Sequence, residues 1–316
     1  MKRILVTGSS GQIGSDLVVE LANRFGKENV FGADLKDPIN KNDMGKFYTT
    51  DITNKNAVEA LIKKYDINIV YHLAGLLSAT GEKMPDEAWR INMTSLKNVL
   101  DLARESSFRV FWPSSIAAFG PSTPQENTPQ QTILEPATMY GVTKVSGELL
   151  CNYYFQKYGV DVRSLRYPGL ISYKAEPGGG TTDYAVGIYY GALQEKKYTC
   201  FVRENTVLPM MYMPDAINAT IDVTEAPSEK IKTRFSYNLA AISFSAKEQE
   251  ESVKKYIPEF FCTYEPDSRQ KIADSWPRTI DDSSARKDWG WKHEYDLDRM
   301  TQDMLEKLKV KLGTKD

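Results

Sequence analysis

The sequence predicts an α/β fold, a doubly wound parallel sheet with helices on both faces and a smaller C-terminal lobe. Two observations support this prediction. Short apolar runs alternate with amphipathic helical patterns through the first half of the 316 residues, as expected for successive strand–helix–strand units. The apolar runs are almost continuous, which is typical of strands covered by helices on both faces. The length fits one large domain or two small ones.

The elements predicted in the first half follow one another closely. Strands are expected at residues 3–7, 30–34, 47–49, 69–73, 109–112 and 161–166. Helices are expected at residues 12–24, 57–65, 87–104 and 140–158. This alternation predicts that residues 1–167 form the sheet domain.

The pattern changes after residue 167. Loops become longer, and helices are expected at residues 183–193, 215–223, 246–256 and 296–311. A proline and three glycines at residues 177–180 predict a hinge-like turn. Because no low-complexity linker separates the halves, residues 168–316 are predicted to form mainly a smaller lobe, with some segments returning to the sheet.

Composition excludes several classes of function. The 40 basic and 42 acidic residues leave a net charge of −2, so there is no electrostatic case for a nucleic acid or a polybasic membrane partner. The two histidines, His72 and His293, are too few for a multi-histidine metal site and make a Ser-His-Asp hydrolase a poor prediction. We therefore expect no metal, and we predict that His72 is a packed strand residue.

Cysteine usage and the N-terminal stretch indicate the compartment. Three widely spaced cysteines, Cys151, Cys200 and Cys262, suit a reducing environment and predict a cytoplasmic protein without a disulfide framework. The apolar stretch at the start is interrupted at Thr7 and Gly8, which predicts a buried strand and not a signal peptide. No apolar run approaches the roughly 18 residues of a membrane span.

A glycine-rich segment connects the first predicted strand to the first predicted helix. Gly8 permits a tight turn, Gly11 lets the backbone approach a pyrophosphate, and Gly14 allows close packing of helix and strand. The free N–H groups of the helix N-terminus face the same anion. Three further residues of the segment are included in this predicted site: Ser10, Gln12 and Ile13. Glycines also mark ordinary turns, but here they have the strand–turn–helix context that dinucleotide binding requires.

An acidic residue follows at the distance expected for a dinucleotide site. Asp34 lies twenty residues after Gly14, at the end of the second predicted strand. A carboxylate there accepts hydrogen bonds from a ribose diol and repels a 2′-phosphate, which favours NAD over NADP. Leu35 is included in the same site. Residues 1–167 are therefore predicted to be a Rossmann-type NAD-binding domain.

Two further strand ends are predicted to contact the cofactor. Asp51 and Ile52 follow the third strand, where the carboxylate either reaches the adenine amine or caps the next helix. Both alternatives remain open. Leu73, Ala74 and Gly75 end the fourth strand, and the small residues there suit close passage of a cofactor backbone.

Tyr140 and Lys144 stand one turn apart at the start of a long predicted helix. A tyrosine with a pKa of roughly 10 is a poor base, but a nearby ammonium and a positively charged nicotinamide ring lower that pKa. A shift of about three pKa units needs roughly 4 kcal/mol of differential stabilisation of the phenolate. A surface pair of residues four apart is the usual explanation of this spacing, and the glycine segment upstream favours catalysis.

Ser114 and Ser115 lie at the end of the fifth strand, twenty-five residues before Tyr140 counted from Ser115. The carboxyl ends of parallel strands are where open α/β sheets bind ligands. Two hydroxyls there are predicted to orient a substrate alcohol and to stabilise the carbonyl oxygen formed from it. The alternative is a pair of turn serines that cap the next segment.

With these residues in place, the chain resembles the extended short-chain dehydrogenase/reductase family, whose prototypes are nucleotide-sugar epimerases and dehydratases. The resemblance includes residues 281–285 and 289–291, a late helix signature of that family. It implies that Asn92 supports the active-site water network and cofactor. It also implies cofactor contacts after the sixth strand, from Tyr167, Pro168 and Leu170.

Within the family, five strings are similar to the branch that oxidises L-threonine. They are residues 115–120, 166–172, 177–185, 208–215 and 275–277. The nucleotide-sugar branch usually carries a diphosphate-binding asparagine where this chain has Gly169, directly after Pro168. The resemblance therefore implies that NAD oxidises the 3-hydroxyl of L-threonine to 2-amino-3-oxobutyrate, on the way to glycine or aminoacetone. Tyr140 is then the general base, and Lys144 holds the nicotinamide ribose.

Several residues are expected to bind the ammonium and carboxylate of the substrate. They are Ser78, Gly180, Thr181, Thr182, Asp183 and Trp276. The segment 181–183 alternatively caps a helix, and Trp276 alternatively packs in a core. The glycines beside them predict that residues 175–185 close over a small substrate.

The resemblance also implies a homodimer, built through the helices around residues 87–104 and 140–158. Aromatic residues supply apolar area on the second helix: Tyr153, Tyr154, Phe155 and Tyr158. Two other functions remain as alternatives, an NAD-dependent nucleotide-sugar epimerase or dehydratase and a non-catalytic NAD-sensing scaffold. The first is disfavoured by Gly169 and the second by the presence of Tyr140 and Lys144.

Overall fold

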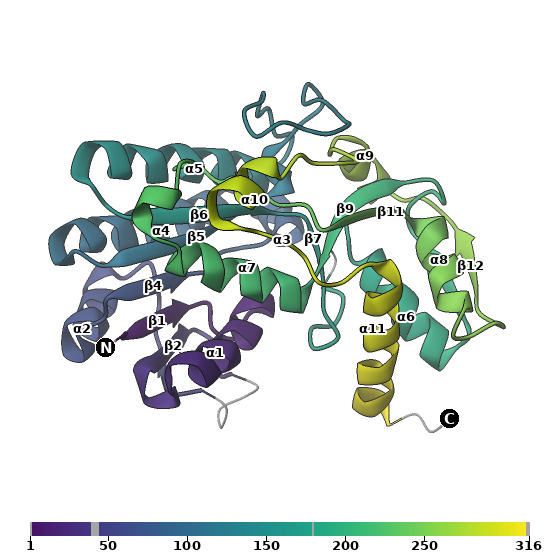
Figure 1. Ribbon diagram of the computed structural model, residues 1–316, viewed down its shortest axis with the longest axis horizontal. Helices are drawn as coiled ribbons and strands as arrows, with labels where there is room; N and C mark the ends of the chain where they lie inside the picture. The colour runs from purple at the N-terminus through teal and green to yellow at the C-terminus, as the bar shows by residue number, and fades with distance from the viewer. Residues whose placement is uncertain (1, 39–43, 179, 314–316) are drawn as a thin grey trace.

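The computed structural model describes residues 2–38, 44–178 and 180–313, and it confirms the predicted α/β fold (Figure 1). Its centre is a seven-stranded sheet with the order β10-β6-β5-β4-β1-β2-β3, in which every neighbouring pair is parallel. The strands are β1 (Ile4–Thr7), β2 (Val30–Asp34), β3 (Lys46–Thr49), β4 (Ile69–His72), β5 (Arg109–Ser115), β6 (Val162–Tyr167) and β10 (Tyr237–Asn238).

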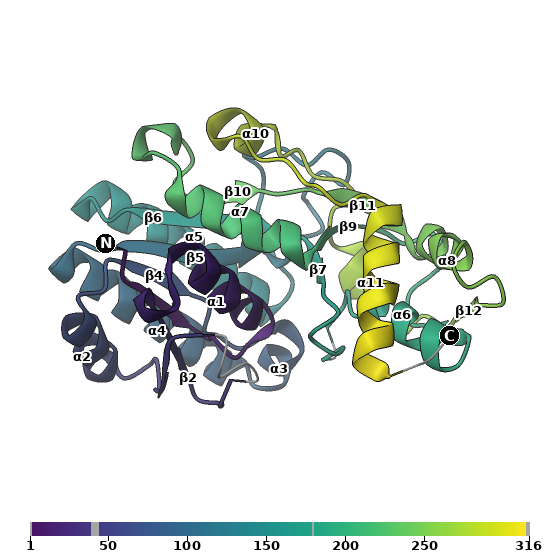
Figure 2. The same ribbon diagram turned by 60° about the horizontal axis from the view of Figure 1, so that its bottom comes forward.

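Helices cover both faces of this sheet (Figures 1 and 2). One face carries α1 (Gln12–Phe25) and α7 (Met213–Glu225), and the other carries α2 (Lys55–Tyr65), α4 (Pro85–Ser106) and α5 (Met139–Tyr158). In β1, Ile4 and Val6 pack into the core under α1 and α7, whereas Leu5 packs under α2, α4 and α5. Because successive strand side chains alternate between faces, a strand covered on both faces is apolar throughout.

The direction of strand addition reverses between β1 and β4. From β1 the chain adds β2 and β3 on one side, and it then returns to add β4, β5 and β6 on the other. Thr7 and His72, the last residues of β1 and β4, stand in register. The loops after these two strands therefore diverge at the carboxyl edge of the sheet, which is where open α/β sheets bind ligands.

The remaining strands form two smaller sheets. One has the order β11-β9-β7, with β7 (Gly169–Ile171), β9 (Val207–Tyr212) and β11 (Ile242–Ser245). In the other, β8 (Lys197–Cys200) pairs with β12 (Phe261–Tyr264). Four helices share a separate apolar core with these sheets: α6 (Tyr184–Gln194), α8 (Ala246–Lys254), α9 (Arg269–Asp274) and α11 (Leu297–Leu312). From the same half of the chain, α7, β10 and α10 (Ser283–Trp289) return to the large sheet.

Two elements near the carboxyl edge differ from the sequence prediction. β5 continues through Pro113 to Ser115, three residues past the predicted end at 112. Beyond Phe111 it pairs with β6 alone, and a strand paired on one side tolerates proline. A short helix, α3 (Ser78–Lys83), occupies the segment predicted to be a loop after β4. Residue 179 of the predicted hinge lies outside the described residues.

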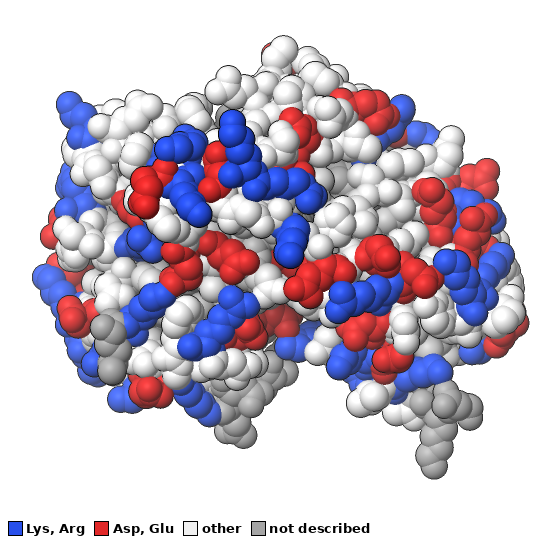
Figure 3. All heavy atoms as spheres, viewed as in Figure 1, with Lys and Arg blue, Asp and Glu red and all other residues white. Residues whose placement is uncertain are grey.

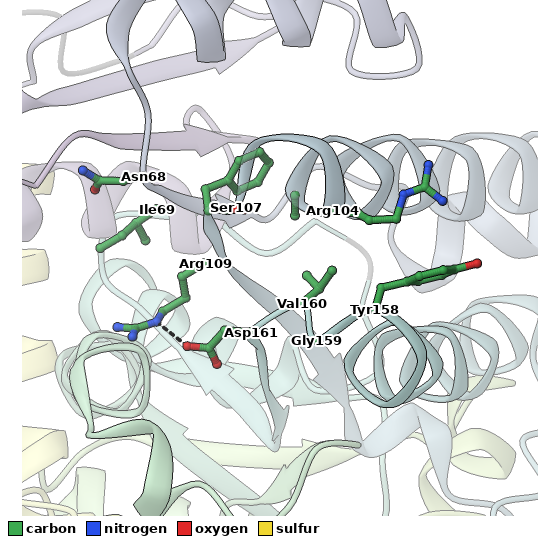
Figure 4. A pocket seen from close by; sticks show the side chains of 11 residues that line it. Asn68, Ile69, Arg104, Ser107, Arg109, Tyr158, Gly159, Val160 and Asp161 are labelled. Carbon is green, nitrogen blue, oxygen red and sulfur yellow. Dashed lines mark hydrogen bonds and ion pairs between the residues drawn. The ribbon is translucent and has the colours of Figure 1, made fainter.

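Ion pairs secure the opposite edge of the sheet, at the amino ends of β5 and β6. Asp161 accepts hydrogen bonds from Arg109, Arg163 and Arg234. The fully buried Arg163 also donates to carbonyl groups in the last turn of α7, which satisfies acceptors that a helix end leaves unpaired. A pocket of about 380 Å³ opens here between the ends of α4 and α5 (Figure 4). It lies on the edge away from the glycine-rich loop.

The surface carries charges of both signs. On the face shown in Figure 3, basic and acidic side chains are interspersed, in keeping with the net charge of −2. Among the described residues, no helix is both long and apolar enough to cross a membrane. The same part of the chain contains no group of three or more metal-ligating side chains.

Candidate active site

The loop between β1 and α1 approaches the loop after β4 so closely that only glycine fits. Gly8 has a φ of 72°, and a Cβ added to it would lie 2.6 Å from the Ala74 backbone nitrogen. A Cβ on Gly14 would lie 2.1 Å from the Gly8 carbonyl oxygen. Gly11 is the N-cap of α1, and no side chain caps this helix. Its first N–H groups therefore remain available to an anion, so the loop fits a pyrophosphate.

Asp34 ends β2 beside this loop. One of its carboxylate oxygens accepts a hydrogen bond from the Ser10 backbone nitrogen at 3.0 Å, and the other from the Lys36 backbone nitrogen at 3.1 Å. Each carboxylate oxygen has two acceptor positions, so the side chain is held in place and can still accept from a ribose diol. Leu35, the next residue, is 68% exposed.

Asp51 binds its own turn. Its Oδ1 accepts hydrogen bonds from the backbone nitrogen and the hydroxyl of Thr53, at 2.9 and 2.8 Å, and these bonds lower the pKa of Asp51. The N-cap of α2 is Asn54, whose side chain accepts from Ala57. The helix-cap alternative for Asp51 is therefore wrong, because α2 begins at Lys55 and its N-cap is Asn54. Ile52 packs into the core under α2.

His72, the last residue of β4, is 1% exposed. Its Nδ1 lies 2.8 Å from Thr7 Oγ1, and its Nε2 lies 3.2 Å from Ser95 Oγ. Burial lowers the pKa of His72 to about 3, because a charged imidazolium loses its hydration there. His72 is thus a packed neutral residue, which confirms the prediction.

Asn92 on α4 ties the segment after β4 to α5. Its Oδ1 accepts from the Leu76 backbone nitrogen at 2.7 Å, and its Nδ2 donates to the Leu76 carbonyl and to Thr143 Oγ1, both at 3.2 Å. A Cβ on Gly75 would lie 2.9 Å from the same Oδ1. Asn92 therefore fixes the backbone that the sequence predicted to border the cofactor.

Tyr140, Lys144 and Ser115 meet at the carboxyl end of β5. α5 begins with Thr138 as N-cap, which places Tyr140 and Lys144 in its first two turns. Lys144 Nζ donates to the Pro113 carbonyl at 2.6 Å and lies 5.2 Å from the centroid of the Tyr140 ring. The Ser115 hydroxyl lies near enough to the Tyr140 phenol to lower the pKa of that phenol. The structure thus brings together a phenol, an ammonium and a hydroxyl.

Removal from water dominates the titration of this cluster. It raises the pKa of Tyr140 to about 12, and the Ser115 hydroxyl opposes that rise. It lowers the pKa of Lys144 to about 8. Burial therefore keeps the phenol protonated at neutral pH in the chain without cofactor. The lowering of its pKa expected from the sequence rests on Lys144 and a nicotinamide ring together.

Known proteins resemble this chain over nearly its full length. Residues 4–240 match the NAD dependent epimerase/dehydratase family. This chain belongs to that family. An uncharacterized epimerase/dehydratase of Staphylococcus saprophyticus is 49% identical to this family member over 314 residues, 98% of each chain.

Solved structures also resemble this chain over nearly its full length. The L-threonine dehydrogenase of Clostridium difficile shares 52% identity with it at a TM-score of 0.96, covering 98% of both chains. A GalE-like L-threonine dehydrogenase from Cupriavidus necator, in its holo form, shares 51% identity at a TM-score of 0.95, covering 97% of this chain and all of the other. NAD is the cofactor of the family, and the glycine cradle, the uncapped α1 and Asp34 fit it.

The contacts of Ser114 do not match its predicted role of orienting a substrate. It is 2% exposed, and its hydroxyl donates to Glu148 Oε1 at 2.5 Å. Ser114 therefore lies beneath α5 with its hydroxyl engaged by Glu148, whereas Ser115 is half-buried beside Tyr140. Tyr167 is likewise buried, with its hydroxyl bonded to Thr220 on α7. The Tyr167 side chain consequently points into the core and away from the predicted cofactor site. Pro168 is also buried, and Leu170 is half-buried.

Two of the predicted substrate residues, Ser78 and Trp276, lie in different surroundings. Ser78 begins α3, and this helix packs against α5, with Gly81 near the Tyr140 Cβ. Trp276 is 7% exposed and belongs to the apolar core of the C-terminal half, on which Tyr140 also packs. The structure therefore supports the core alternative for Trp276.

The segment before α6 is held by its own hydrogen bonds. Asp183 occupies the N-cap position of α6 without a side-chain bond to that helix, and its Oδ2 accepts from the Gly180 backbone nitrogen at 2.7 Å. Thr181 is 4% exposed. Thr182 lies against Gly169, because a Cβ there would be 2.8 Å from Thr182 Cγ2.

Sequence reasoning missed Glu148 and Arg166, which form a buried ion pair beside the site. The available signal was spacing, since Glu148 follows Lys144 by one helical turn and an acidic residue is rare on a buried helix face. It also missed the ion pair between Asp16 of α1 and Lys174, which precedes the loop to α6.

Proposed function

We propose that this chain oxidises the 3-hydroxyl of L-threonine to 2-amino-3-oxobutyrate, with reduction of NAD to NADH. The observation that carries the proposal is the meeting of Tyr140, Lys144 and Ser115 at the end of β5, next to the glycine cradle. About 50% identity to L-threonine dehydrogenases over nearly the whole chain supports the choice of substrate.

Each of the three side chains has a distinct task. The Ser115 hydroxyl orients the substrate alcohol toward Tyr140, and Tyr140, as the phenolate, accepts the alcohol proton as general base. Lys144 remains mostly protonated at neutral pH, because its pKa lies near 8, and it supplies positive charge beside the phenol. When bound in the cradle, NAD supplies the hydride acceptor and a second positive charge. Both charges oppose the rise in the Tyr140 pKa that burial causes.

The geometry around Gly169 favours a small substrate over a nucleotide sugar. A Cβ at this position would lie 2.4 Å from Met210 Sδ and 2.8 Å from Thr182 Cγ2. An asparagine, which the nucleotide-sugar branch uses there to hold the diphosphate, therefore does not fit without displacing the Met210 side chain and Thr182 of the segment before α6. Thr182 and Thr181 remain the proposed contacts of the substrate carboxylate, with Gly180 and Asp183 shaping the segment.

NADH absorbance tests the proposal. We expect reduction of NAD with L-threonine and none with UDP-glucose, and Tyr140→Phe should lower kcat by at least about 100-fold. Tyr153→Phe is the matched control, because Tyr153 is on the same helix but 50% exposed. Activity of Tyr140→Phe equal to that of Tyr153→Phe would remove Tyr140 as the base, and turnover of UDP-glucose would favour the nucleotide-sugar alternative. Binding of NAD without turnover of either would favour the scaffold alternative.

We also infer that two copies associate through α4 and α5. These helices lie side by side, and their outer surface carries Trp89, Val142, Leu149 and Tyr153, which are 37–57% exposed. Contiguous exposed apolar side chains mark association surfaces. Light scattering should show a dimer that Leu149→Glu converts to a monomer, whereas Val310→Glu, at an 83% exposed apolar residue of α11, leaves it unchanged.

The free thiols of Cys151, Cys200 and Cys262 support a cytoplasmic location.

A further inference from the structure

We propose that Glu148, held by Arg166, is a positioning residue that fixes the Tyr140–Lys144 pair on the end of β5 and keeps Lys144 charged. This inference rests on the proposed function. Glu148 touches neither the cofactor cradle nor Tyr140 in the contacts described above, so it acts through Lys144 and Ser114.

Three successive turns of α5 lie against three successive residues of β5. Lys144 donates to the Pro113 carbonyl at 2.6 Å, Glu148 accepts from the Ser114 hydroxyl at 2.5 Å, and Tyr140 lies beside Ser115. Residues four apart lie on the same face of a helix, so these contacts form one row. Between them, Gly147 lets α5 approach the Trp112 ring, to which an added Cβ would be 2.3 Å. The row determines how α5 sits on the strand end.

The carboxylate of Glu148 is held from three directions. Arg166 Nε donates to Oε1 at 2.8 Å and Arg166 Nη2 to Oε2 at 2.6 Å, and Ser114 adds the third bond. Glu148 is 1% exposed and Arg166 is 4% exposed. Because Ser114 and Arg166 are opposite one another in the β5–β6 register, the two strands present both donors at one point.

Arg166 is itself hydrogen-bonded to the neighbouring strand β10 and to a loop residue, Gln130. Its Nη1 donates to Asn238 Oδ1 at 3.0 Å and to the Gln130 carbonyl at 3.1 Å. Asn238 Nδ2 in turn donates to the carbonyls of Thr128 and Asp281, both at 3.2 Å. A shift of the ion pair would therefore disturb β10 and the two segments that contain Thr128 and Gln130 and Asp281.

Stability alone does not account for this ion pair. A buried pair of charges loses hydration energy that its mutual attraction only partly returns, and apolar residues of similar volume often serve as well. The position of Glu148, one turn from Lys144, indicates an electrostatic role in addition.

Glu148 is the anion that faces Lys144 among the described groups. The titratable groups packed around Lys144 are Tyr140, Glu148 and Cys151 on α5 and His72 on β4, with Arg166 of β6 behind Glu148. Burial keeps the His72 imidazole neutral and the Cys151 thiol protonated at neutral pH. Glu148 therefore offsets the loss of hydration that otherwise favours the neutral amine of Lys144.

Glu148→Gln tests the proposal, because it removes the charge and keeps the size and a hydrogen-bond acceptor. We expect kcat/KM for threonine at pH 7.5 to fall about tenfold, and the rise of activity with pH to move up by about one pH unit. The KM for NAD should change less than about threefold, since the cradle is untouched. A pH profile that superimposes on that of the wild type would overturn the proposal.

Two variants separate positioning from folding. Glu148→Gln combined with Arg166→Gln leaves no unpaired buried charge, so it should regain thermal stability and keep the shifted profile. Glu250→Gln is the matched control, since Glu250 is a 2% exposed carboxylate on α8 bonded to Lys247, Lys254 and Tyr264. It should lose stability with an unshifted profile. An unshifted profile in the double variant, or an equal shift in Glu250→Gln, would refute a specific role.

A readout without substrate distinguishes this proposal from the proposed function. Competitive acetylation of Lys144 with acetic anhydride across pH, followed by peptide mass spectrometry, reports the charge of the amine. In Glu148→Gln its midpoint should move down by about one pH unit. If the wild type fails to oxidise threonine while this midpoint moves, the proposed function fails and the positioning role stands. An unmoved midpoint overturns the positioning role whatever the substrate.

Discussion

The two histidines of the chain allow a direct test of His72 as a packed neutral residue. Burial lowers the pKa of His72 to about 3 in the folded protein, whereas an unfolded histidine has a pKa of about 6.5. Between these values the unfolded chain binds a proton that the folded chain does not. The contribution of His72 to the free energy of unfolding is therefore fully present above about pH 6.5 and is lost as the pH falls toward 3. Linkage gives a loss of about 2 kcal/mol between pH 7.5 and pH 5.

Urea unfolding of the wild type and of His72→Gln at the two pH values measures this loss. Glutamine can bond to Thr7 and Ser95 but does not titrate, so the extra loss of about 2 kcal/mol should disappear in the variant. His293→Gln, which removes the other histidine, is the control and should keep the loss. If His72→Gln and the wild type weaken equally on acidification, the assignment of a neutral buried imidazole is refuted. Activity at pH 8 should persist in folded His72→Gln, because the ring bonds only to Thr7 and Ser95.

Three further predictions concern the cofactor and substrate sites. Asp34→Ser should raise the ratio of NADP to NAD turnover at least about tenfold, because it removes the charge that repels a 2′-phosphate; an unchanged ratio in coupled assays would exclude Asp34 as the discriminating residue. Gly169→Ala should lower the free energy of unfolding by about 1–3 kcal/mol through overpacking against Met210 and Thr182, and raise the KM for threonine more than that for NAD. Chemical denaturation and steady-state kinetics check both effects, and wild-type values in both would contradict the packing argument. Hydrogen–deuterium exchange of residues 175–185 should slow when NAD and threonine bind together, and equal exchange would count against closure of this segment.

Local pattern predicted most elements of the large sheet. The strand expected at 30–34 is β2, and the helix expected at 140–158 is α5 with one additional residue at its start. These elements have continuous apolar runs or long periodic faces, so few alternatives compete with them. The short strands of the C-terminal half were not predicted. β7 and β9 contain glycine or proline and become strands by pairing, β7 with β9 and β9 also with β11.

The sequence by itself determined the glycine cradle, Asp34 and the pair Tyr140–Lys144. These features depend on spacing along one loop or one helix, and local geometry is sufficient to bring such residues together. Tertiary structure decided which of two adjacent serines faces the site. Both serines lie against α5, where the Ser114 hydroxyl bonds to the buried Glu148 and Ser115 lies beside Tyr140. Only the docking of α5 on β5, with β6 beside them, determines which hydroxyl remains for a substrate.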